Sequence, residues 1–426
     1  MKIDPRELWN WLWGRRWRIG LAAAVLMGAA FRLIWLSDME YKADEAWTFE
    51  HVKAFLQTGE APAIGMRSSA GVPNAGLSVW LFLALGYMTH ALTPLALAQA
   101  VQITNVVALL LLTVFALRMV SRREREPWLW ATALVAVNPL SVLFSRKIWA
   151  QDLLPLFTLG FLTAWWRRSS RIGAFCWGLI GALLGQIHLS GFLFAASFAL
   201  VTLIRDRRSV DWPAWLAGSV MGIAPMAPWL SVLLHGAAGT SGTTWRPPDL
   251  RFLEFFLYWP GLATGLDLPY ALGHDFLRFL ASPFIGSIPT CFSGAVFAAV
   301  AVLWARLIGG FVFRAKAGDA RPRHLSAQTS SALALIASFA VYGPLYILVG
   351  GKIHLHYMII AFPLPALSMI WLADAGAPKL PRLLLGSLTL TTAILTMLFL
   401  VYIHNSEYIR GDYGAPYRAT QTQGVP

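Results

Sequence analysis

Two adjacent carboxylates, Asp44 and Glu45, follow the first long apolar run of the chain. An ionisable group held near a bilayer is costly, so its presence there suggests a function. A helix over residues 43–57 would place the two carboxylates on different faces, with Asp44 near the helix N-terminus. The helix dipole would favour the anion of Asp44, which suits a general base better than a proton donor. The alternative is a solvated loop carboxylate or a helix cap.

Three further polar groups stand at the ends of other apolar runs: Arg146, Lys147 and Asp152; Gln186 and His188; and Lys352, His354, His356 and Tyr357. Asp152 directly precedes an apolar run, where a charge is costly unless a cation or a substrate pairs with it; a helix cap is the alternative. The basic residues could instead reach lipid headgroups, and His188 could be a hydrogen-bonded residue of a helix junction. Two histidines at i and i+2 leave most of a coordination shell unfilled, so no metal site is predicted and no cofactor is assigned.

The elements that position these groups must be membrane helices. Hydrophobic residues make up 57% of the 426 residues, charged residues only 13%, and there are 20 tryptophans. Apolar runs near the ~20 residues that cross a bilayer recur along the whole chain, which predicts an all-α polytopic membrane protein with one membrane domain. The net charge of +13 comes without a basic cluster with interleaved stacking aromatics outside the short segments between apolar runs, so the basic residues are interpreted as topology signals and nucleic-acid binding is not expected. The two cysteines, Cys176 and Cys291, build neither a disulfide framework nor a metal site.

Lysine and arginine counts predict the orientation, because short basic loops stay cytoplasmic. One set of segments between apolar runs carries 21 basic residues and the other set carries eleven. Residues 1–18 are predicted to form a cytoplasmic interfacial prefix, and residues 19–403 a transmembrane domain with external loops at 37–96, 145–152, 235–284 and 350–356. Residues 404–426 are then an external tail. The run from Ile19 to Leu36 is too long for a signal-peptide core and is expected to be an uncleaved first span.

About eleven crossings are expected, plus juxtamembrane helices on the external side. The orientation requires that residues 76–92 form a short helix that enters from the outer face without crossing. The predicted crossings are residues 19–36, 97–117, 127–144, 153–166, 172–187, 190–204, 212–234, 285–313, 328–349, 357–373 and 383–403.

Five motifs of this chain, in this order, resemble the GT-C class of integral-membrane glycosyltransferases. They are Ala43-Asp44-Glu45-Ala46-Trp47, residues 55–60 (FLQTGE), residues 72–77 (VPNAGL), residues 144–152 (FSRKIWAQD) and residues 356–363 (HYMIIAFP). The chain is similar in style to bacterial relatives of the protein O-mannosyltransferases and to the lipid A aminoarabinose transferase. It differs from many such enzymes in that no large domain follows the last span, which would leave acceptor recognition to the membrane core and the 235–284 loop.

The resemblance implies transfer of a sugar from a polyprenyl-phosphate-linked donor to a protein, lipid or polysaccharide acceptor, at the external face of a bacterial cytoplasmic membrane. The expected reaction is a single displacement with Asp44 as the base and Asp152 as a second catalytic carboxylate. Glu45 and His188 would position the acceptor. Five residues would bind the lipid phosphate: Arg146, Lys147, Lys352, His356 and Tyr357.

Two other classes remain open at this point. A transporter or flippase for lipid-linked sugars would also carry polar groups in broken apolar runs, although no repeated halves are detected here. A structural partner in a membrane complex would not need the external carboxylates. The identity of the sugar and of the acceptor does not follow from the sequence.

Overall fold

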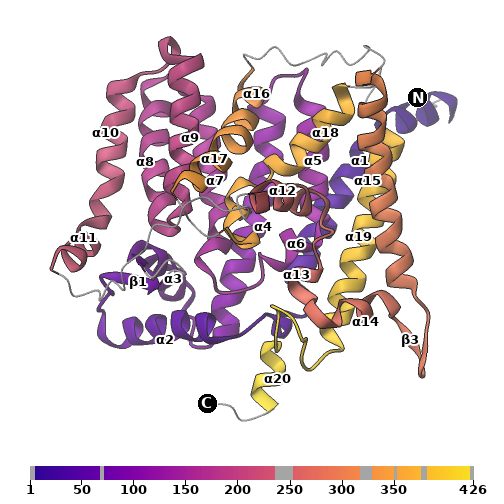
Figure 1. The fold of residues 1–426 in the computed structure, drawn as a ribbon, viewed down its shortest axis with the longest axis horizontal. Coiled ribbons are helices and arrows are strands. Elements are labelled where there is room, and N and C mark those ends of the chain that lie inside the picture. The colour runs from indigo at the N-terminus through magenta and orange to yellow at the C-terminus, as the bar shows by residue number, and fades with distance from the viewer. Residues whose placement is uncertain are drawn as a thin grey trace.

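The structure is a computed structural model that describes residues 5–67, 72–235, 253–316, 329–349, 353–375 and 381–422. These residues are almost entirely helical, and their only strands are two short hairpins, β1 (Ile64–Arg67) with β2 (Pro73–Ala75) and β3 (Phe284–Ile285) with β4 (Ile288–Pro289). The predicted all-α polytopic membrane fold is therefore confirmed (Figure 1).

The longest apolar helices form the body of a bundle. Within the described residues, five stretches are long and apolar enough to cross a membrane: α4 (Pro94–Arg118), α10 (Trp212–Ile223) with α11 (Ala227–Leu234), α15 (Phe292–Lys316), the stretch from Ser330 to Leu348, and α19 (Arg382–His404). A sixth is possible if η7 (Leu355–Ala361) and α18 (Leu364–Ala375), which meet at a bend of 72°, form one broken span. The expected number of about eleven is not confirmed.

The difference from eleven arises from short or broken helices. The helices α7 (Ala150–Trp166), α8 (Arg171–Ile187) and α9 (Ser190–Arg205) contain 17, 17 and 16 residues, below the ~20 that span the hydrocarbon layer without tilt. The predicted crossing at residues 127–144 consists of two helices, α5 (Arg125–Val137) and α6 (Pro139–Leu143). The chain breaks at Asn138, whose side chain accepts hydrogen bonds from the backbone N–H groups of Leu140 and Ser141.

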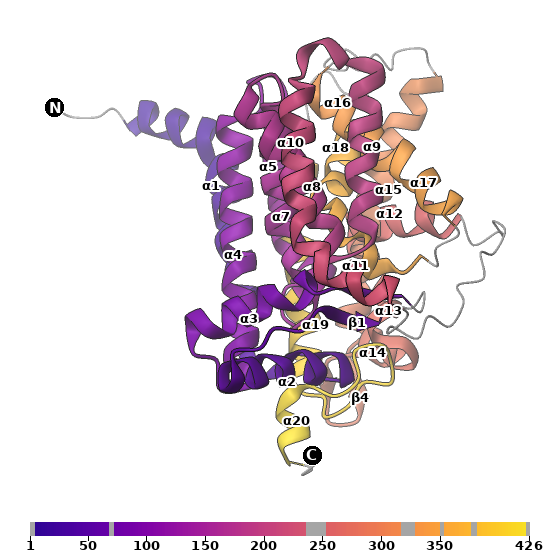
Figure 2. The same ribbon diagram turned by 90° about the vertical axis from the view of Figure 1, so that its left-hand side faces the viewer.

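The N-terminal prefix and the first predicted span form one continuous helix, α1 (Pro5–Leu33), whose first turns project away from the bundle (Figure 2). The apolar stretch at residues 76–92 forms α3 (Leu77–Thr89), which has 13 residues. At 1.5 Å per residue this helix is about 20 Å long, so it is shorter than the hydrocarbon layer.

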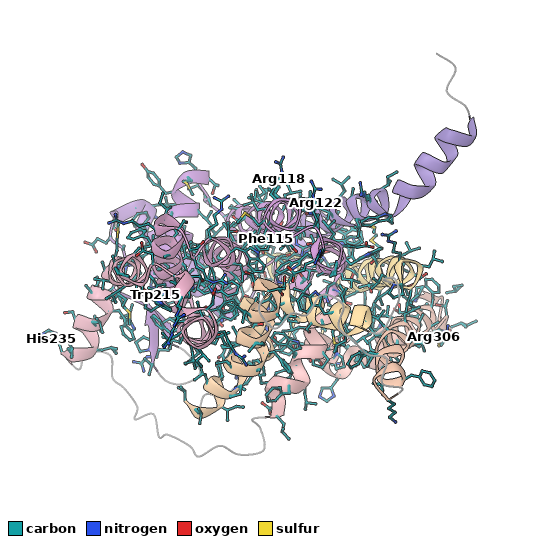
Figure 3. All side chains as sticks on the ribbon, turned by 90° about the horizontal axis from the view of Figure 1, so that it is seen from above. Phe115, Arg118, Arg122, Trp215, His235 and Arg306 are labelled. Carbon is teal, nitrogen blue, oxygen red and sulfur yellow. The ribbon has the colours of Figure 1, made fainter. Side chains whose placement is uncertain are left out.

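Small residues allow the closest helix packing. A Cβ atom on Gly218 of α10 would overlap the carbonyl of Phe175 in α8, and one on Gly178 of α8 would overlap the carbonyl of Trp215. Figure 3 views the helices from above, with Trp215 on one side of the molecule and Arg306 of α15 on the other. Between them, α12 (Glu254–Thr264) packs against α18, with Phe255 and Trp259 buried.

The segments predicted to be external gather at one end of the bundle. This end, at the bottom of Figure 1, holds α2 (Ala43–Thr58), α3, β1, α13 (Pro269–Leu272), α14 (Phe276–Ala281) and α20 (Tyr417–Thr422). The visible start of α1 lies toward the opposite end. The remaining short elements are η1 (Leu36–Asp38), η2 (Arg207–Ser209), η3 (Ala224–Met226), η5 (Gly273–Asp275), α16 (Ser330–Leu335), η6 (Ile336–Val341) and α17 (Tyr342–Leu348).

Candidate functional site

A polar cavity of about 260 Å³ lies at this end of the bundle, lined by α2, the β1–β2 hairpin, α3, residues 148–151, the α8–α9 junction and η7. Its polar lining residues are Asp44, Thr48, Arg67, Asn74, Ser78, Gln151, His188, His354, His356 and Tyr357. Segments that are more than 300 residues apart in the sequence thus meet around one volume.

Asp44 is the only carboxylate among the lining residues that the structure describes. It stands in the first turn of α2 and is exposed, as the helix pattern predicts. Lys42 precedes the helix in extended conformation, and Thr48 bonds back to the carbonyl of Asp44, so the first turn is well anchored. The N-terminal end of α2 therefore presents an anion to the cavity.

Glu45 points the other way and is fully buried. Its Oε2 atom accepts a hydrogen bond of 2.9 Å from the backbone N–H of Lys42 and so caps α2, while its Oε1 atom is buried without a partner. Burial raises the pKa of Glu45 to about 8, and the negative charge of Glu40 adds to this shift. The structure places Glu45 beneath the helix rather than in the cavity.

Aromatic rings line the cavity between these polar groups. Trp47 packs on His51 with 3.9 Å between ring centroids, and Trp149 approaches His356 at 5.0 Å. Two polar atoms of lining residues, Nε1 of Trp149 and Oδ1 of Asn74, are buried without a hydrogen-bond partner. Buried polar groups are normally paired, so these two atoms are exceptions in the wall of the cavity.

The histidine and tyrosine residues predicted for the site come together on the far wall. His188 ends α8, its Nδ1 lies 2.7 Å from Oγ of Ser190, and its ring is 4.6 Å from that of Tyr357. His356 Nδ1 lies 2.9 Å from the hydroxyl of Tyr270, and the rings of His354 and His356 stack at 5.4 Å. The structure thus brings His188, His356 and Tyr357 to the same cavity as Asp44.

Lys147 and Asp152 do not line the cavity, contrary to the expected phosphate-binding and catalytic positions. Lys147 is buried and pairs with Glu40, Nζ to Oε2, at 2.5 Å; the same Nζ lies 3.6 Å above the ring of Trp149. Asp152 is also buried: Oδ2 accepts a bond from the backbone N–H of Lys147, and Oδ1 has no partner. Both residues therefore lie behind Trp149, outside the cavity, and support this part of its wall.

Arg146 is also away from the cavity. Its guanidinium donates to the backbone carbonyls of Phe31, Ile34 and Trp35, each at 2.8 Å. These carbonyls belong to the last turn of α1 and the residues that follow it, and helix C-termini leave such groups without intrahelical partners. We therefore assign Arg146 to the cap of α1 and not to a phosphate. Lys352, the remaining predicted phosphate ligand, lies outside the described residues.

Several residues of the site did not emerge from the sequence. Glu40 stands close to the Asp44 motif, but its pairing with Lys147 crosses 107 residues and leaves no local signal. Arg67 and Asn74 belong to the hairpin that closes one side of the cavity, and Tyr270 reaches His356 from α13. Among the residues that the structure places, no three His, Cys, Asp or Glu side chains are arranged to hold a metal ion.

The chain is thus an all-helical membrane protein with a cavity, rich in aromatic and histidine side chains, at one end of the bundle and a single carboxylate within it. No known family model matches the sequence, and no curated protein matches it either. Among solved structures, the fold is similar to an oligosaccharyltransferase of Archaeoglobus fulgidus, with a TM-score of 0.43 and 14% identity over 91% of this chain; the match spans 56% of that protein. It is also similar to ArnT of Cupriavidus metallidurans, with a TM-score of 0.41 and 13% identity, over 87% of this chain and 76% of that one.

Proposed function

We propose that this chain is a membrane glycosyltransferase of the GT-C type that moves a sugar from a polyprenyl-phosphate donor to an acceptor at the outer face of the cytoplasmic membrane. The observation that carries the proposal is the position of Asp44, alone among the described carboxylates in a cavity with aromatic walls. A lone anionic base suits deprotonation of an acceptor hydroxyl or amine.

The cavity suits a hydroxylated ligand. Trp47 and Trp149 offer apolar ring surfaces for the C–H face of a sugar, and the polar lining residues Asp44, Asn74 and Gln151 offer partners for its hydroxyls. Polar lining groups of this kind favour a ligand that can pair with them, because a ligand without matching groups would displace their water and leave them unsatisfied. A purely apolar substrate is disfavoured for the same reason.

The proposed reaction is a single in-line displacement. The acceptor atom attacks the anomeric carbon, Asp44 takes its proton, and the bond from the anomeric carbon to the phosphate oxygen breaks. The products are the glycosylated acceptor and polyprenyl phosphate. Positive and polar groups must stabilise the departing phosphate, and the candidates are Arg67 of the hairpin, His356 and Tyr357, together with Lys352. Arg67 takes the place first assigned to Arg146 and Lys147.

Asp152 and Glu45 receive supporting roles in this proposal. Asp152 lies behind Trp149 and next to Lys147, so it would shape the cavity wall rather than touch the acceptor. Glu45 would fix the start of α2. His188, against Tyr357, would orient the acceptor or the sugar.

A lipid-linked donor suits a cavity at one end of a membrane bundle. A polyprenyl chain partitions into lipid by ~0.8 kcal/mol for each buried CH₂ group, so the donor arrives from the bilayer and no soluble nucleotide-binding domain is needed. The cavity opens among elements at one end of the bundle, including α2, α3 and the β1–β2 hairpin, and a site at one end of a bundle suits transfer better than transport.

The test uses the purified full-length protein in lipid vesicles with polyprenyl-phosphate sugars labelled in the sugar. We expect label to appear in a membrane-extract acceptor fraction, with release of an equal amount of free polyprenyl phosphate. Vesicles without protein, and protein without acceptor, are the controls. Movement of intact labelled donor across the bilayer, with no polyprenyl phosphate released, would replace this proposal with a transporter.

A further inference from the structure

The C-terminal segment after α19 packs against the chain that leads into Asp44. We call residues 404–420 the C-terminal strap and residues 38–42 the linker. The strap and the linker are joined by an isolated β-bridge between Pro416 and Glu40 and by a hydrogen bond of 2.8 Å from the N–H of Tyr417 to the carbonyl of Met39. Figures 1 and 2 show α20, the end of the strap, at the same end of the molecule as α2.

Asp38 is the centre of this contact. Its carboxylate is only 2% exposed and pairs with two residues of the strap, Oδ1 with Nε of Arg418 and Oδ2 with Nδ1 of His404, each at 2.7 Å. The hydroxyl of Tyr413 also donates to the Asp38 carbonyl. Three strap side chains therefore fix one residue of the linker.

Arg418 also fixes the strap itself. Its second nitrogen donates to the carbonyls of His404 and Ser406, each at 2.6 Å, which closes the strap into a loop around the guanidinium. Lys42, at the far end of the linker, bonds to the carbonyl of Asp412 and pairs with Glu40 at 2.6 Å. Both ends of the linker are thus held by the strap.

The linker leads to both sides of the cavity. Lys42 is the N-cap residue of α2, two positions before Asp44, and the backbone N–H of Lys42 binds the capping Glu45. Glu40 pairs with Lys147, and Lys147 lies against Trp149, which lines the opposite wall. A shift of the linker would therefore move the carboxylate and the wall facing it.

We propose that the C-terminal strap positions Asp44 against the bound donor by fixing residues 38–42, with Arg418 as the positioning residue. This role rests on the proposed function, since it concerns the geometry of the same reaction. A small misplacement of a reacting group can lower turnover by up to a hundredfold without loss of substrate binding. The printed contacts of Arg418 are with Asp38 and with the carbonyls of Ile403, His404 and Ser406, and none of these is a candidate ligand of the donor phosphate, so we expect its replacement to leave donor affinity unchanged.

The test compares Arg418→Gln with Arg410→Gln. Arg410 belongs to the same strap and also pairs with an aspartate, but its partner is Asp275 of η5, at 2.8 Å, and not a residue of the linker. We expect Arg418→Gln to lower kcat roughly tenfold, about 1.4 kcal/mol at the barrier, with KM for the donor unchanged. Hydrogen exchange in residues 38–48 should rise in the same variant. Arg410→Gln should change neither quantity.

Arg418→Lys serves as the conservative variant and as the fallback if Arg418→Gln does not fold. It keeps the charge beside Asp38 but loses the fork that binds the carbonyls, so its kcat should lie between those of the wild type and Arg418→Gln. Wild-type kcat in Arg418→Gln, or equal losses in Arg418→Gln and Arg410→Gln, would overturn the positioning role and leave the proposed function intact. A wild-type protein that releases no polyprenyl phosphate would overturn both.

Discussion

Asp44 and Glu45 are neighbours in the sequence with opposite surroundings. Asp44 is exposed toward the cavity, whereas Glu45 is buried under the first turn of α2 and caps it. A helix rotates successive residues by about 100°, so adjacent carboxylates must face different environments. This separation supports one residue as the base and the other as the residue that holds its helix in place.

The buried carboxyl of Glu45 predicts a pH-dependent stability. Its pKa is raised from the ordinary value of 4.5 to about 8, so the folded protein retains a proton there that the unfolded chain loses. This contribution to stability is complete below pH 4.5 and is lost as the pH rises toward 8. We expect Glu45→Gln, which keeps the capping oxygen, to flatten the fall in melting temperature between pH 5 and 8. An unchanged slope in the variant would contradict this assignment.

Sequence reasoning located the residues of the cavity better than those behind it. The helix period correctly separated Asp44 from Glu45, and the polar residues at the ends of the predicted crossings supplied His188, His356 and Tyr357. It did not place Arg146 and Lys147, because their partners are distant in sequence, and it did not show that Asp152 is buried beside Lys147. Arg146 binds carbonyls more than 110 residues away, and Lys147 finds Glu40 across 107 residues. Pairing of this kind depends on the tertiary structure and leaves no periodic pattern.

At the scale of elements, the site depends on helices that end where the cavity begins. His188 is the C-cap residue of α8, and α2 begins directly after its N-cap residue Lys42, whose backbone N–H donates to the side chain of Glu45. The sequence predicted these helices within a few residues, because apolar runs and capping residues mark their ends. It did not predict the break at Asn138, where an asparagine followed by a proline divides an apolar run into α5 and α6.

The packing of α8 on α10 should tolerate no added volume at its closest point. A Cβ on Gly218 would overlap the backbone of α8, so Gly218→Ala should destabilise the fold by about 1–3 kcal/mol. Gly309→Ala in α15 is the matched control, because its Cβ would meet no atom within 4 Å. That variant should be neutral or slightly stabilised, by up to ~1 kcal/mol, since alanine is the better helix former. The melting temperatures of the two variants are compared by thermal unfolding in detergent. Equal melting temperatures would show that α8 and α10 separate more easily than this packing implies.

At the scale of the whole molecule, the proposal requires that the end with the cavity face outward. Two of the basic residues that predict the orientation, Arg118 and Arg122 at the end of α4 and just after it, lie at the other end and are labelled in the view from above (Figure 3). The distribution of charge between the predicted loops predicts this orientation, whereas the apolar runs alone do not predict the number of crossings. Runs such as residues 127–144 and 357–373 are apolar enough to cross but are broken or bent in the structure.

The orientation predicts which cysteines an impermeant thiol reagent reaches. Cys291 is exposed, next to the β3–β4 hairpin at the cavity end. In a Cys176→Ser variant, Cys291 should react with the reagent in intact cells. A second variant replaces Cys291 with serine and carries Ser169→Cys, which lies at the opposite end between α7 and α8. The new cysteine should react only after the membrane is permeabilised. The reverse pattern would show that the cavity faces the cytoplasm and would contradict a reaction at the external face.

The central claim is that Asp44 is the base of a sugar transfer, and one comparison tests it directly. Asp44→Asn is measured beside Glu50→Gln, which removes another exposed carboxylate of α2 that does not line the cavity. We expect Asp44→Asn to lower release of polyprenyl phosphate at least 100-fold, in line with the contribution of general bases, with donor binding and melting temperature unchanged. Glu50→Gln should retain wild-type turnover. Near-normal turnover of Asp44→Asn would contradict the account.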